Sequence, residues 1–341
     1  MKVAITGGGT GGHLAIGTAL IEALKTKGHE AIYIGSTSGQ DTAWFSDDLR
    51  FEKRYFLETS GVVNRKYLGK VWALFKIFRA VLKSRKILKD NQIEAVISVG
   101  GYSAAAATFA AYTKRIPFFI HEQNAVMGRL NTMMKPYARA FYSSYDENSP
   151  VKDYPVRDVF FSTAHTRKEI KTILFLGGSQ GAQFINNLAM ETAATCMDKG
   201  IKIIHQCGER DFERVQKAYE EMNLDVELYS FTKELPLLIE RADLAVSRAG
   251  ASTLWEVTAN GLPALFVPYP YAAGDHQFYN AEYLVEKGLA WSHRECDAYA
   301  HNLLDILESD LEEKSRGLMA LSHKDGAIAI IDNIEESLDV S

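Results

Sequence analysis

The fold is decided by the stretch Ile5-Thr6-Gly7-Gly8-Gly9-Thr10-Gly11-Gly12-His13, whose plan recurs as Phe175-Leu176-Gly177-Gly178-Ser179-Gln180-Gly181-Ala182. In each stretch a short apolar run enters a glycine turn and then a helical pattern. A strand, a glycine turn and a helix in this order open a parallel βαβ unit, and the helix N-terminus presents N–H groups to an anion. The repeat predicts two domains that begin alike and bind phosphate alike.

Short β-branched runs alternate with amphipathic helical patterns through both halves, which is typical of parallel sheets. The expected strands are 2–6, 31–34, 95–99 and 117–121, then 173–176, 201–206, 226–229, 244–246 and 264–267. A polar stretch from 146 to about 166, with two prolines, has neither period and is expected to be the linker. The predicted fold is α/β, with two Rossmann-like doubly wound domains that face each other across a cleft.

Composition narrows the class of protein. The chain has 341 residues, and 47% hydrophobic with 24% charged residues is close to a globular average. Three widely spaced cysteines argue against a disulfide framework or a zinc site and favour a reducing cytosol. We expect no signal peptide and no membrane span, so any membrane contact is peripheral. A net charge of −5 gives no reason to expect nucleic acid as a partner.

The first turn also satisfies the dinucleotide pattern GxGxxG, so an oxidoreductase that uses NAD or FAD is an alternative. Such enzymes bind the ribose with an acidic residue at the end of the second strand. Here that strand ends Tyr33-Ile34-Gly35-Ser36-Thr37, without a carboxylate. The interpretation of the protein as an NAD- or FAD-dependent oxidoreductase therefore loses most of its support.

Two further features belong to the first half. His13 directly follows the first turn, where a side chain that titrates near neutrality can act as a base or donate to phosphate. Another glycine turn, Gly100-Gly101-Tyr102-Ser103, stands at a strand-to-helix junction and offers a second anion site.

Between 59 and 89 the chain has nine basic residues and no acidic one. Within 65–89, apolar residues that include Trp72, Phe75 and Phe78 alternate with lysines and arginines at roughly helical spacing. This pattern is typical of a helix that lies on an anionic membrane surface. A solvated charged face over an ordinary core helix is the alternative.

Five motifs in order resemble the bacterial MurG family over nearly the whole chain. They are Gly-Gly-Thr-Gly-Gly-His at 8–13, Gly-Gly-Tyr at 100–102, His-Glu-Gln-Asn at 121–124, Gly-Gly-Ser-Gln-Gly-Ala at 177–182 and Gly-Leu-Pro-Ala-Leu-Phe-Val-Pro at 261–268. The resemblance implies a GT-B glycosyltransferase that moves N-acetylglucosamine (GlcNAc) from UDP-GlcNAc to the 4-hydroxyl of MurNAc in undecaprenyl-pyrophosphoryl-MurNAc-pentapeptide (lipid I). The product is lipid II for peptidoglycan, formed with inversion. The sequence shows no DxD-type metal site suited to a sugar diphosphate, so we expect no protein-held metal, and no cofactor is expected.

The same resemblance divides the chain into an acceptor and membrane-associating domain (1–157), a UDP-GlcNAc domain (158–325) and a C-terminal helix (326–341) that packs back on the first domain. It also places the enzyme on the cytoplasmic face of the inner membrane, as a peripheral protein. The turn 100–103 is then assigned to the acceptor pyrophosphate, and the segment 65–89 to the anionic membrane.

Residue roles follow from the resemblance position by position. It implies that His13 is the catalytic base or a ligand of the acceptor pyrophosphate, with Glu122 as the next candidate base. The implied substrate-binding residues are Thr10, Gly11, Gly12, Asn124, Arg157, Ser179, Thr232, Ala251, Ser252, Glu256, His276 and Gln277. Among these, Ser179 and Arg157 approach the diphosphate, and Glu256 binds the ribose hydroxyls.

Several alternatives remain at this stage. Thr253-x-x-Glu256 is equally a capping box, and Asn124 could cap the next helix. Family members usually have Gly-Asn before Pro-Val-Arg, whereas this chain has Asp153-Tyr154. Another GT-B transferase, a UDP-GlcNAc epimerase and a non-catalytic nucleotide-binding module are the rival functions.

Overall fold

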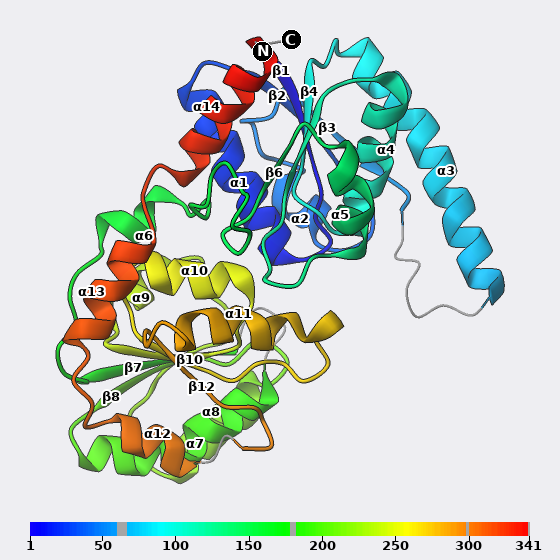
Figure 1. Ribbon diagram of the computed structural model, residues 1–341. Coiled ribbons are helices and arrows are strands. Elements are labelled where there is room, and N and C mark those ends of the chain that lie inside the picture. Colours follow the sequence, from blue (N-terminus) through cyan, green and yellow to red (C-terminus); the bar gives the residue numbers. More distant parts are fainter. Residues whose placement is uncertain (60–66, 178–181, 298–299, 340–341) are drawn as a thin grey trace. The chain divides into compact units, whose positions relative to one another are not determined.

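A computed structural model of the chain describes residues 1–59, 67–177, 182–297 and 300–339, and only the backbone of 67–74. The chain divides into two compact units, and Figure 1 shows both. Unit 1 comprises Met1–Val156 with Asp325–Ser341, and unit 2 comprises Arg157–Lys324. Arg157 therefore opens unit 2, one residue before the expected division.

Unit 1 is built on a six-stranded parallel sheet with the order β3-β2-β1-β4-β5-β6. The strands are β1 (Lys2–Thr6), β2 (Glu30–Ser36), β3 (Lys53–Leu57), β4 (Ala95–Ser98), β5 (Phe118–His121) and β6 (Ala140–Tyr142). The helices are α1 (Gly11–Thr26), α2 (Asp41–Phe45), α3 (Tyr67–Asp90), η1 (Tyr102–Ala104), α4 (Ala105–Lys114), α5 (Arg129–Met134), η2 (Lys135–Tyr137) and α14 (Gly326–Asp339).

Unit 2 has a second parallel sheet with the order β12-β11-β10-β7-β8-β9. Its strands are β7 (Thr172–Leu176), β8 (Lys202–Gln206), β9 (Glu227–Tyr229), β10 (Leu244–Ser247), β11 (Ala264–Phe266) and β12 (Trp291–Ser292). The helices are α6 (Asp158–Ser162), α7 (Gln183–Asp198), α8 (Phe212–Glu221), α9 (Leu235–Arg241), α10 (Ala251–Ala259), η3 (Ala273–Asp275), α11 (His276–Val285), α12 (Ala300–Ile306) and α13 (Glu312–Leu321).

The nine expected strands are confirmed to within a few residues, and three more strands, β3, β6 and β12, were missed. All three lie at a sheet edge. In β3 only Leu57 is buried, and β6 and β12 have only three and two residues, so these edge strands give a weak signal in the sequence. The expected linker 146–166 was wrong in part, because helix α6 forms within it.

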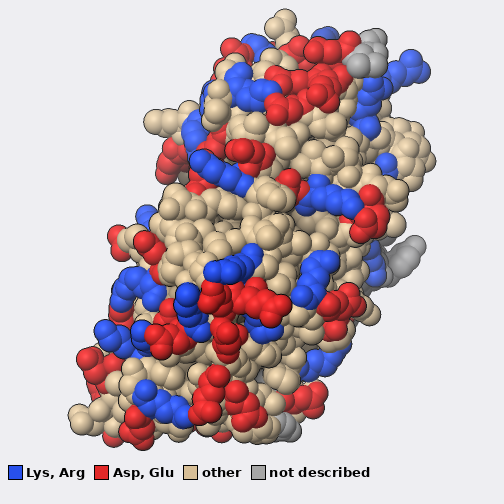
Figure 2. Space-filling view, turned by 60° about the vertical axis from the view of Figure 1, so that its left-hand side comes forward, with Lys and Arg blue, Asp and Glu red and all other residues tan. Residues whose placement is uncertain are grey.

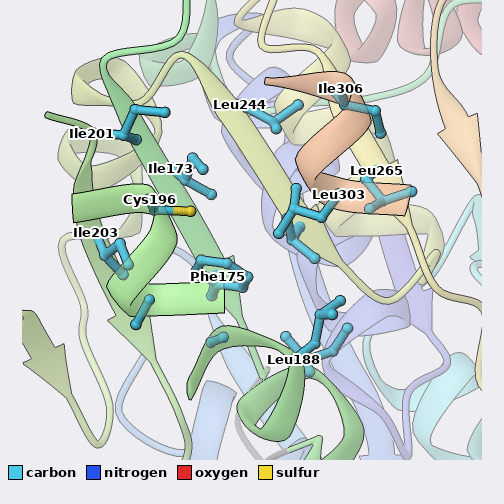
Figure 3. Packing of buried hydrophobic residues seen from close by; sticks show 14 of the residues in the cluster. Ile173, Phe175, Leu188, Cys196, Ile201, Ile203, Leu244, Leu265, Leu303 and Ile306 are labelled. Atoms are coloured by element: carbon cyan, nitrogen blue, oxygen red, sulfur yellow. The ribbon is translucent and has the colours of Figure 1, made fainter. Parts of the chain in front are cut away.

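The core of unit 2 explains why the sequences of its central strands are continuous apolar runs. Figure 3 shows Ile173 and Phe175 of β7 gathered with Leu188 and Cys196 of α7 and Leu303 of α12, and all five are buried. Helices cover the sheet, so its inner strands have no solvated face and need no polar alternation.

Helix α14 belongs to unit 1 although it ends the chain, and it packs on α1 (Figure 1). Ile330, Ile331 and Ile334 are fully buried there. At the polar margin of this contact, Lys27 pairs with Asp332 and Glu335.

Both sheets have the same topology, because in each the first strand of the unit lies between its second and fourth strands. The chain leaves the sheet in opposite directions from the first and fourth strands, and ligands bind outside the carboxyl ends of the strands at such a switch point. The first turn follows β1, and the turn at 100–101 follows β4. In unit 2 the turn at 177 follows β7, and 248–250 follows β10.

Membrane-spanning helices, cysteines, metal sites and surface charge also bear on the class of protein, and each is stated here for the described part of the chain. No helix in it combines the length and apolar character needed to cross a membrane. Cys196, Cys207 and Cys296 are free thiols. Within the same described ranges, no three His, Cys, Asp or Glu side chains gather as a metal site. On the face that Figure 2 shows, lysines and arginines are interspersed with acidic residues.

Candidate functional site

The two glycine turns of unit 1 interlock. Gly7 and Gly9 have φ of 126° and 86°, which favours glycine. The Gly8 amide donates to the carbonyl of Gly100 at 3.2 Å, and a Cβ on Gly7 would lie 2.5 Å from that oxygen. The glycines therefore allow two backbones to touch at the switch point, which a merely tight turn would not require.

His13 lies at the start of α1 beside the second turn. Its Nδ1 is hydrogen-bonded to Thr10 Oγ1 at 2.8 Å, and its Nε2 faces Gly100, whose Cβ would lie 3.4 Å away. Since Thr10 occupies one ring nitrogen, Nε2 is the atom directed at the turns. It can accept a proton or donate to phosphate according to the tautomer.

His121, at the end of β5, is buried beside this group. Burial, with a smaller contribution from His13, lowers its pKa to about 3. His121 is therefore neutral at physiological pH and adds no charge to the site.

Glu122 is a hydrogen-bond acceptor for its own loop. Oε1 accepts from the backbone amide of Asn124 at 3.0 Å, and Oε2 accepts from the amide of Gly128 at 2.8 Å and from Asn131 Nδ2 at 2.9 Å. A general base must be able to take a proton, which would weaken these bonds. The contacts favour a positioning role for Glu122 over that of a base.

Asn124 does not cap the next helix, because α5 begins at Arg129 and its N-cap is Gly128. Tyr102 is held across the second turn, since its hydroxyl donates to the carbonyl of Ser38 at 2.6 Å. Ser103, next to it, is buried in η1. The structure thus brings residues 10–13, 100–103 and 122–124 to the carboxyl ends of β1, β4 and β5.

Helix α3 carries the basic segment along the side of unit 1 (Figure 1). Phe75, Phe78 and Leu82 are about half exposed, at 47%, 60% and 50%, and follow the spacing of one helix face. Arg79, Lys83, Arg85, Lys86 and Lys89 are exposed on the same helix. Arg65 and Lys66 lie outside the described residues.

The first turn of unit 2 is described only in part, because Ser179 lies outside the described residues. The Gly177 amide donates to the carbonyl of Gln206 at 2.7 Å, and a Cβ on Gly177 would meet Asn186 Oδ1 at 3.1 Å. Gly177 is thus tightly enclosed between β8 and α7.

Glu256 lies inside α10, whose N-cap is Gly250 and whose first residues are Ala251 and Ser252. Thr253 is therefore within the helix, and the alternative capping box with Glu256 does not form. Burial raises the pKa of the Glu256 carboxyl to about 7, and the positive charge of Arg157 acts in the opposite direction. The departure at Asp153-Tyr154 has left Arg157 close enough to act on this carboxyl.

The remaining residues expected to bind the donor lie at loop ends in unit 2. Thr232 Oγ1 accepts from the Glu234 amide at 2.9 Å, after β9. His276 opens α11 with Nδ1 2.9 Å from the carbonyl of Ala273. Gln277 Oε1 accepts from the Tyr269 amide at 2.9 Å, which leaves its NH₂ group directed elsewhere.

Sequence reasoning assigned no role to Arg248 or Asp41. Arg248, directly after β10, donates to the carbonyls of Val267 and Pro268 at 3.0 and 3.3 Å and pairs with Glu295. A cation at the carboxyl end of a central strand was a readable signal for Arg248. Nothing local marked Asp41, which is fully buried against the first glycine turn.

Two parallel sheets of the same topology, with glycine turns after β1 and β4 in unit 1, agree with the two-domain GT-B fold. The model of the glycosyltransferase family 28 N-terminal domain matches residues 3–143, and that of the family 28 C-terminal domain matches 172–334. The chain therefore belongs to glycosyltransferase family 28, and within it to the MurG family.

Similar proteins agree over the full length. UDP-N-acetylglucosamine--N-acetylmuramyl-(pentapeptide) pyrophosphoryl-undecaprenol N-acetylglucosamine transferase of Sulfurimonas denitrificans is 55% identical, with 99% of this chain and 100% of that protein covered. The Wolinella succinogenes protein of the same name is 53% identical over 98% of this chain and 99% of its own. The crystal structure of Acinetobacter baumannii MurG has a TM-score of 0.78 at 26% identity and covers 98% of this chain and 99% of that one.

Proposed function

We propose that the protein transfers GlcNAc from UDP-GlcNAc to the MurNAc 4-hydroxyl of lipid I, giving lipid II and UDP. The observation that carries the proposal is the full-length similarity to two transferases whose names state this reaction. Residues 10–13, 100–103 and 122–124, which belong to the family's motifs, lie at the carboxyl ends of β1, β4 and β5 and support it.

We assign the donor to unit 2. Arg157 and Ser179 neutralise the diphosphate as it leaves, together with helix N-termini that favour negative charge. Glu256 accepts both ribose hydroxyls, Thr232 meets the uracil through its backbone, and the NH₂ of Gln277 donates to the sugar, with His276 beside it. Ala251 and Ser252 bring the start of α10 to the nucleotide.

We assign the acceptor to unit 1, where the turns at 10–12 and 100–103 bind its pyrophosphate. His13 Nε2 takes the proton from the attacking hydroxyl or binds this pyrophosphate. In the first case Thr10 must accept a hydrogen bond from Nδ1–H, so that Nε2 carries the lone pair. Asn124 contacts the GlcNAc that is transferred.

One assay tests the reaction against its rivals. The protein is incubated with UDP-GlcNAc and a soluble lipid I analogue, and both UDP and disaccharide are measured. We expect UDP and disaccharide in equal amounts, and neither without the analogue. UDP release without the analogue would favour an epimerase or hydrolase, and no reaction with it would refute the proposal.

His13→Ala separates the two roles of His13. As the base, its loss lowers kcat about 100-fold or more at saturating substrates. As a pyrophosphate ligand, its loss raises the KM for the acceptor instead. An unchanged kcat and KM would exclude both roles.

We further propose that the enzyme works at the cytoplasmic face of the inner membrane, bound peripherally through 65–89. The exposed Phe75, Phe78 and Leu82 enter the interface, while basic residues of α3 meet anionic headgroups. Loss of three positive charges should cost about 3 kcal/mol of binding, or about a hundredfold in partitioning.

Sedimentation with vesicles tests the membrane assignment. Arg79, Lys83 and Lys86 are replaced together by Ser, and partitioning into vesicles with anionic lipid is compared with partitioning into neutral ones. The variant should lose most of its binding to anionic vesicles. If it binds them as the unaltered protein does, α3 is only a solvated helix. Lys199, Lys217 and Lys233 of unit 2, replaced together by Ser, serve as the control.

A further inference from the structure

The loop between β2 and α2 touches the acceptor turns, although no role has been assigned to it. Asp41, the first residue of α2, is fully buried. Its Oδ1 accepts from the Gly9 amide at 2.5 Å. Its Oδ2 accepts from the Ser36 amide at 2.9 Å and from the Tyr33 hydroxyl at 3.2 Å.

The fit around this carboxylate is close. A Cβ on Gly8 would lie 2.6 Å from Asp41 Oδ1, and one on Gly35 would lie 2.8 Å from Oδ2. The Tyr33 hydroxyl also reaches the carbonyl of Gly7 at 2.8 Å. A buried carboxylate therefore binds the first turn at Gly9, and it shares the single Tyr33 hydroxyl hydrogen with the carbonyl of Gly7.

The same loop binds the second turn. Ser38 supplies the carbonyl that accepts from the Tyr102 hydroxyl, and a Cβ on Gly39 would lie 2.8 Å from the Cα of Gly9. Residues 36–41 thus hold both acceptor turns from one side. In dinucleotide-binding proteins the corresponding loop offers its carboxylate to a ribose. Here the carboxylate faces inward and occupies an N–H group of the glycine turn.

We propose that Asp41 is the positioning residue of the acceptor pyrophosphate site. Its carboxylate holds the Gly7–Gly9 backbone in the conformation that binds the acceptor and takes the Gly9 amide out of anion binding. The pyrophosphate is thereby directed to the start of α1 and to the second turn. This inference rests on the proposed function, because it assigns the turns to the acceptor.

Asp41→Asn tests the inference with little change in volume. An amide offers one acceptor where the carboxylate offers two, so either Gly9 or Ser36 loses its partner. Because a hydrogen bond to a charged group is among the stronger ones, we expect the KM for the lipid I analogue to rise about tenfold. The KM for UDP-GlcNAc should stay within about twofold, since unit 2 is untouched. Asp47→Asn, an exposed carboxylate on the same segment, is the control and should match the unaltered enzyme.

Hydrogen exchange of residues 6–12 provides a readout that does not depend on turnover. In Asp41→Asn these amides should exchange faster, while those of β4 and β5 keep their protection. Tyr33→Phe, which removes one donor to the same carboxylate, should shift both measurements in the same direction by less.

Three outcomes would overturn the inference. They are an unchanged acceptor KM in Asp41→Asn, an equal rise in both KM values, and loss of protection across the whole of unit 1. Failure of the unaltered protein to transfer GlcNAc would instead refute the proposed function, and the exchange measurement would still report on Asp41.

Discussion

At the scale of single residues, Glu256 shows how packing changes what a side chain can do. Glu256 of α10 is partly exposed as a residue, but desolvation of its carboxyl raises the pKa to about 7. The ionised carboxylate, which accepts at both oxygens, binds two ribose hydroxyls better than the neutral acid does. The free protein is therefore only partly in the binding form near neutral pH, and the affinity for the donor becomes a measure of this titration.

We expect the Kd for UDP-GlcNAc to fall roughly tenfold from pH 6 to pH 8, because the ionised fraction of Glu256 rises about tenfold across a pKa of about 7. Titration calorimetry at several pH values measures this. Glu256→Gln should bind more weakly with little pH dependence, and Glu286→Gln, on the exposed end of α11, should behave as the unaltered protein does. Tighter binding at pH 6 than at pH 8 would contradict the assignment of Glu256 to the ribose.

Also at this scale, the sequence predicted best where a residue's role depends on its neighbours in the chain. The strand pattern located the first turn with His13, and the turn at 100–101, because these segments directly follow strands. It placed them at the carboxyl ends of β1 and β4. Asp41 acts on Gly9, from which it is separated by a whole helix and strand. Glu256 was ambiguous because a capping box and a ligand share the spacing Thr-x-x-Glu, and only the position of the N-cap at Gly250 distinguishes them.

At the scale of elements, the same reasoning explains which strands were found. Inner strands are covered on both faces and appear in the sequence as apolar runs. The missed edge strands are very short, as β6 and β12 are, or mostly not buried, as β3 is, whereas the edge strand β9 was found. Helix α14 has a clear amphipathic pattern, but nothing in that pattern states which sheet it covers. Its polar partners Lys27 and His29, just after the end of α1, are some 300 positions away in the chain.

The contact between α1 and α14 should be sensitive to acid. Lys27, and then His29, lower the pKa of Glu335, while burial opposes the shift. A carboxyl with a lowered pKa stabilises the fold above its unfolded pKa of about 4.3, and this contribution is lost as the pH falls through the folded value. Lys27 also pairs with Asp332, so Lys27, Asp332 and Glu335 form a small network of charges.

Glu335→Gln should therefore lower the Tm at pH 7 by a few degrees, which corresponds to about 1 kcal/mol or less for a partly exposed pair. The difference from the unaltered protein should shrink below about pH 4. Thermal unfolding followed by circular dichroism at pH 7 and below pH 4 measures both. Glu336→Gln, an exposed neighbour, is the control. A Tm difference that grows in acid would contradict the assignment.

At the scale of the whole molecule, the two units have sheets of the same topology but differ in whether one continuous segment of the chain forms the whole unit. Unit 2 is one continuous segment with its own complete sheet and core. Unit 1 consists of two separate segments, because its sheet lies within 1–156 whereas α14 comes from the C-terminal end of the chain. The fully buried isoleucines of α14 would leave an apolar groove on α1 if the helix were removed.

This difference predicts how fragments behave. Residues 157–324 expressed alone should unfold cooperatively and bind UDP, because the sheet and the donor residues are complete within them. Residues 1–156 alone should be unstable or aggregate, since α1 lacks its cover. Gly326 lies beside Asp153 and Tyr154, where a Cβ would be 3.0 Å from the Tyr154 carbonyl, so a short linker can join 156 to 325. That fusion should restore a cooperative transition in calorimetry. Equal stability of 1–156 with and without 325–341 would show that α14 is dispensable to unit 1.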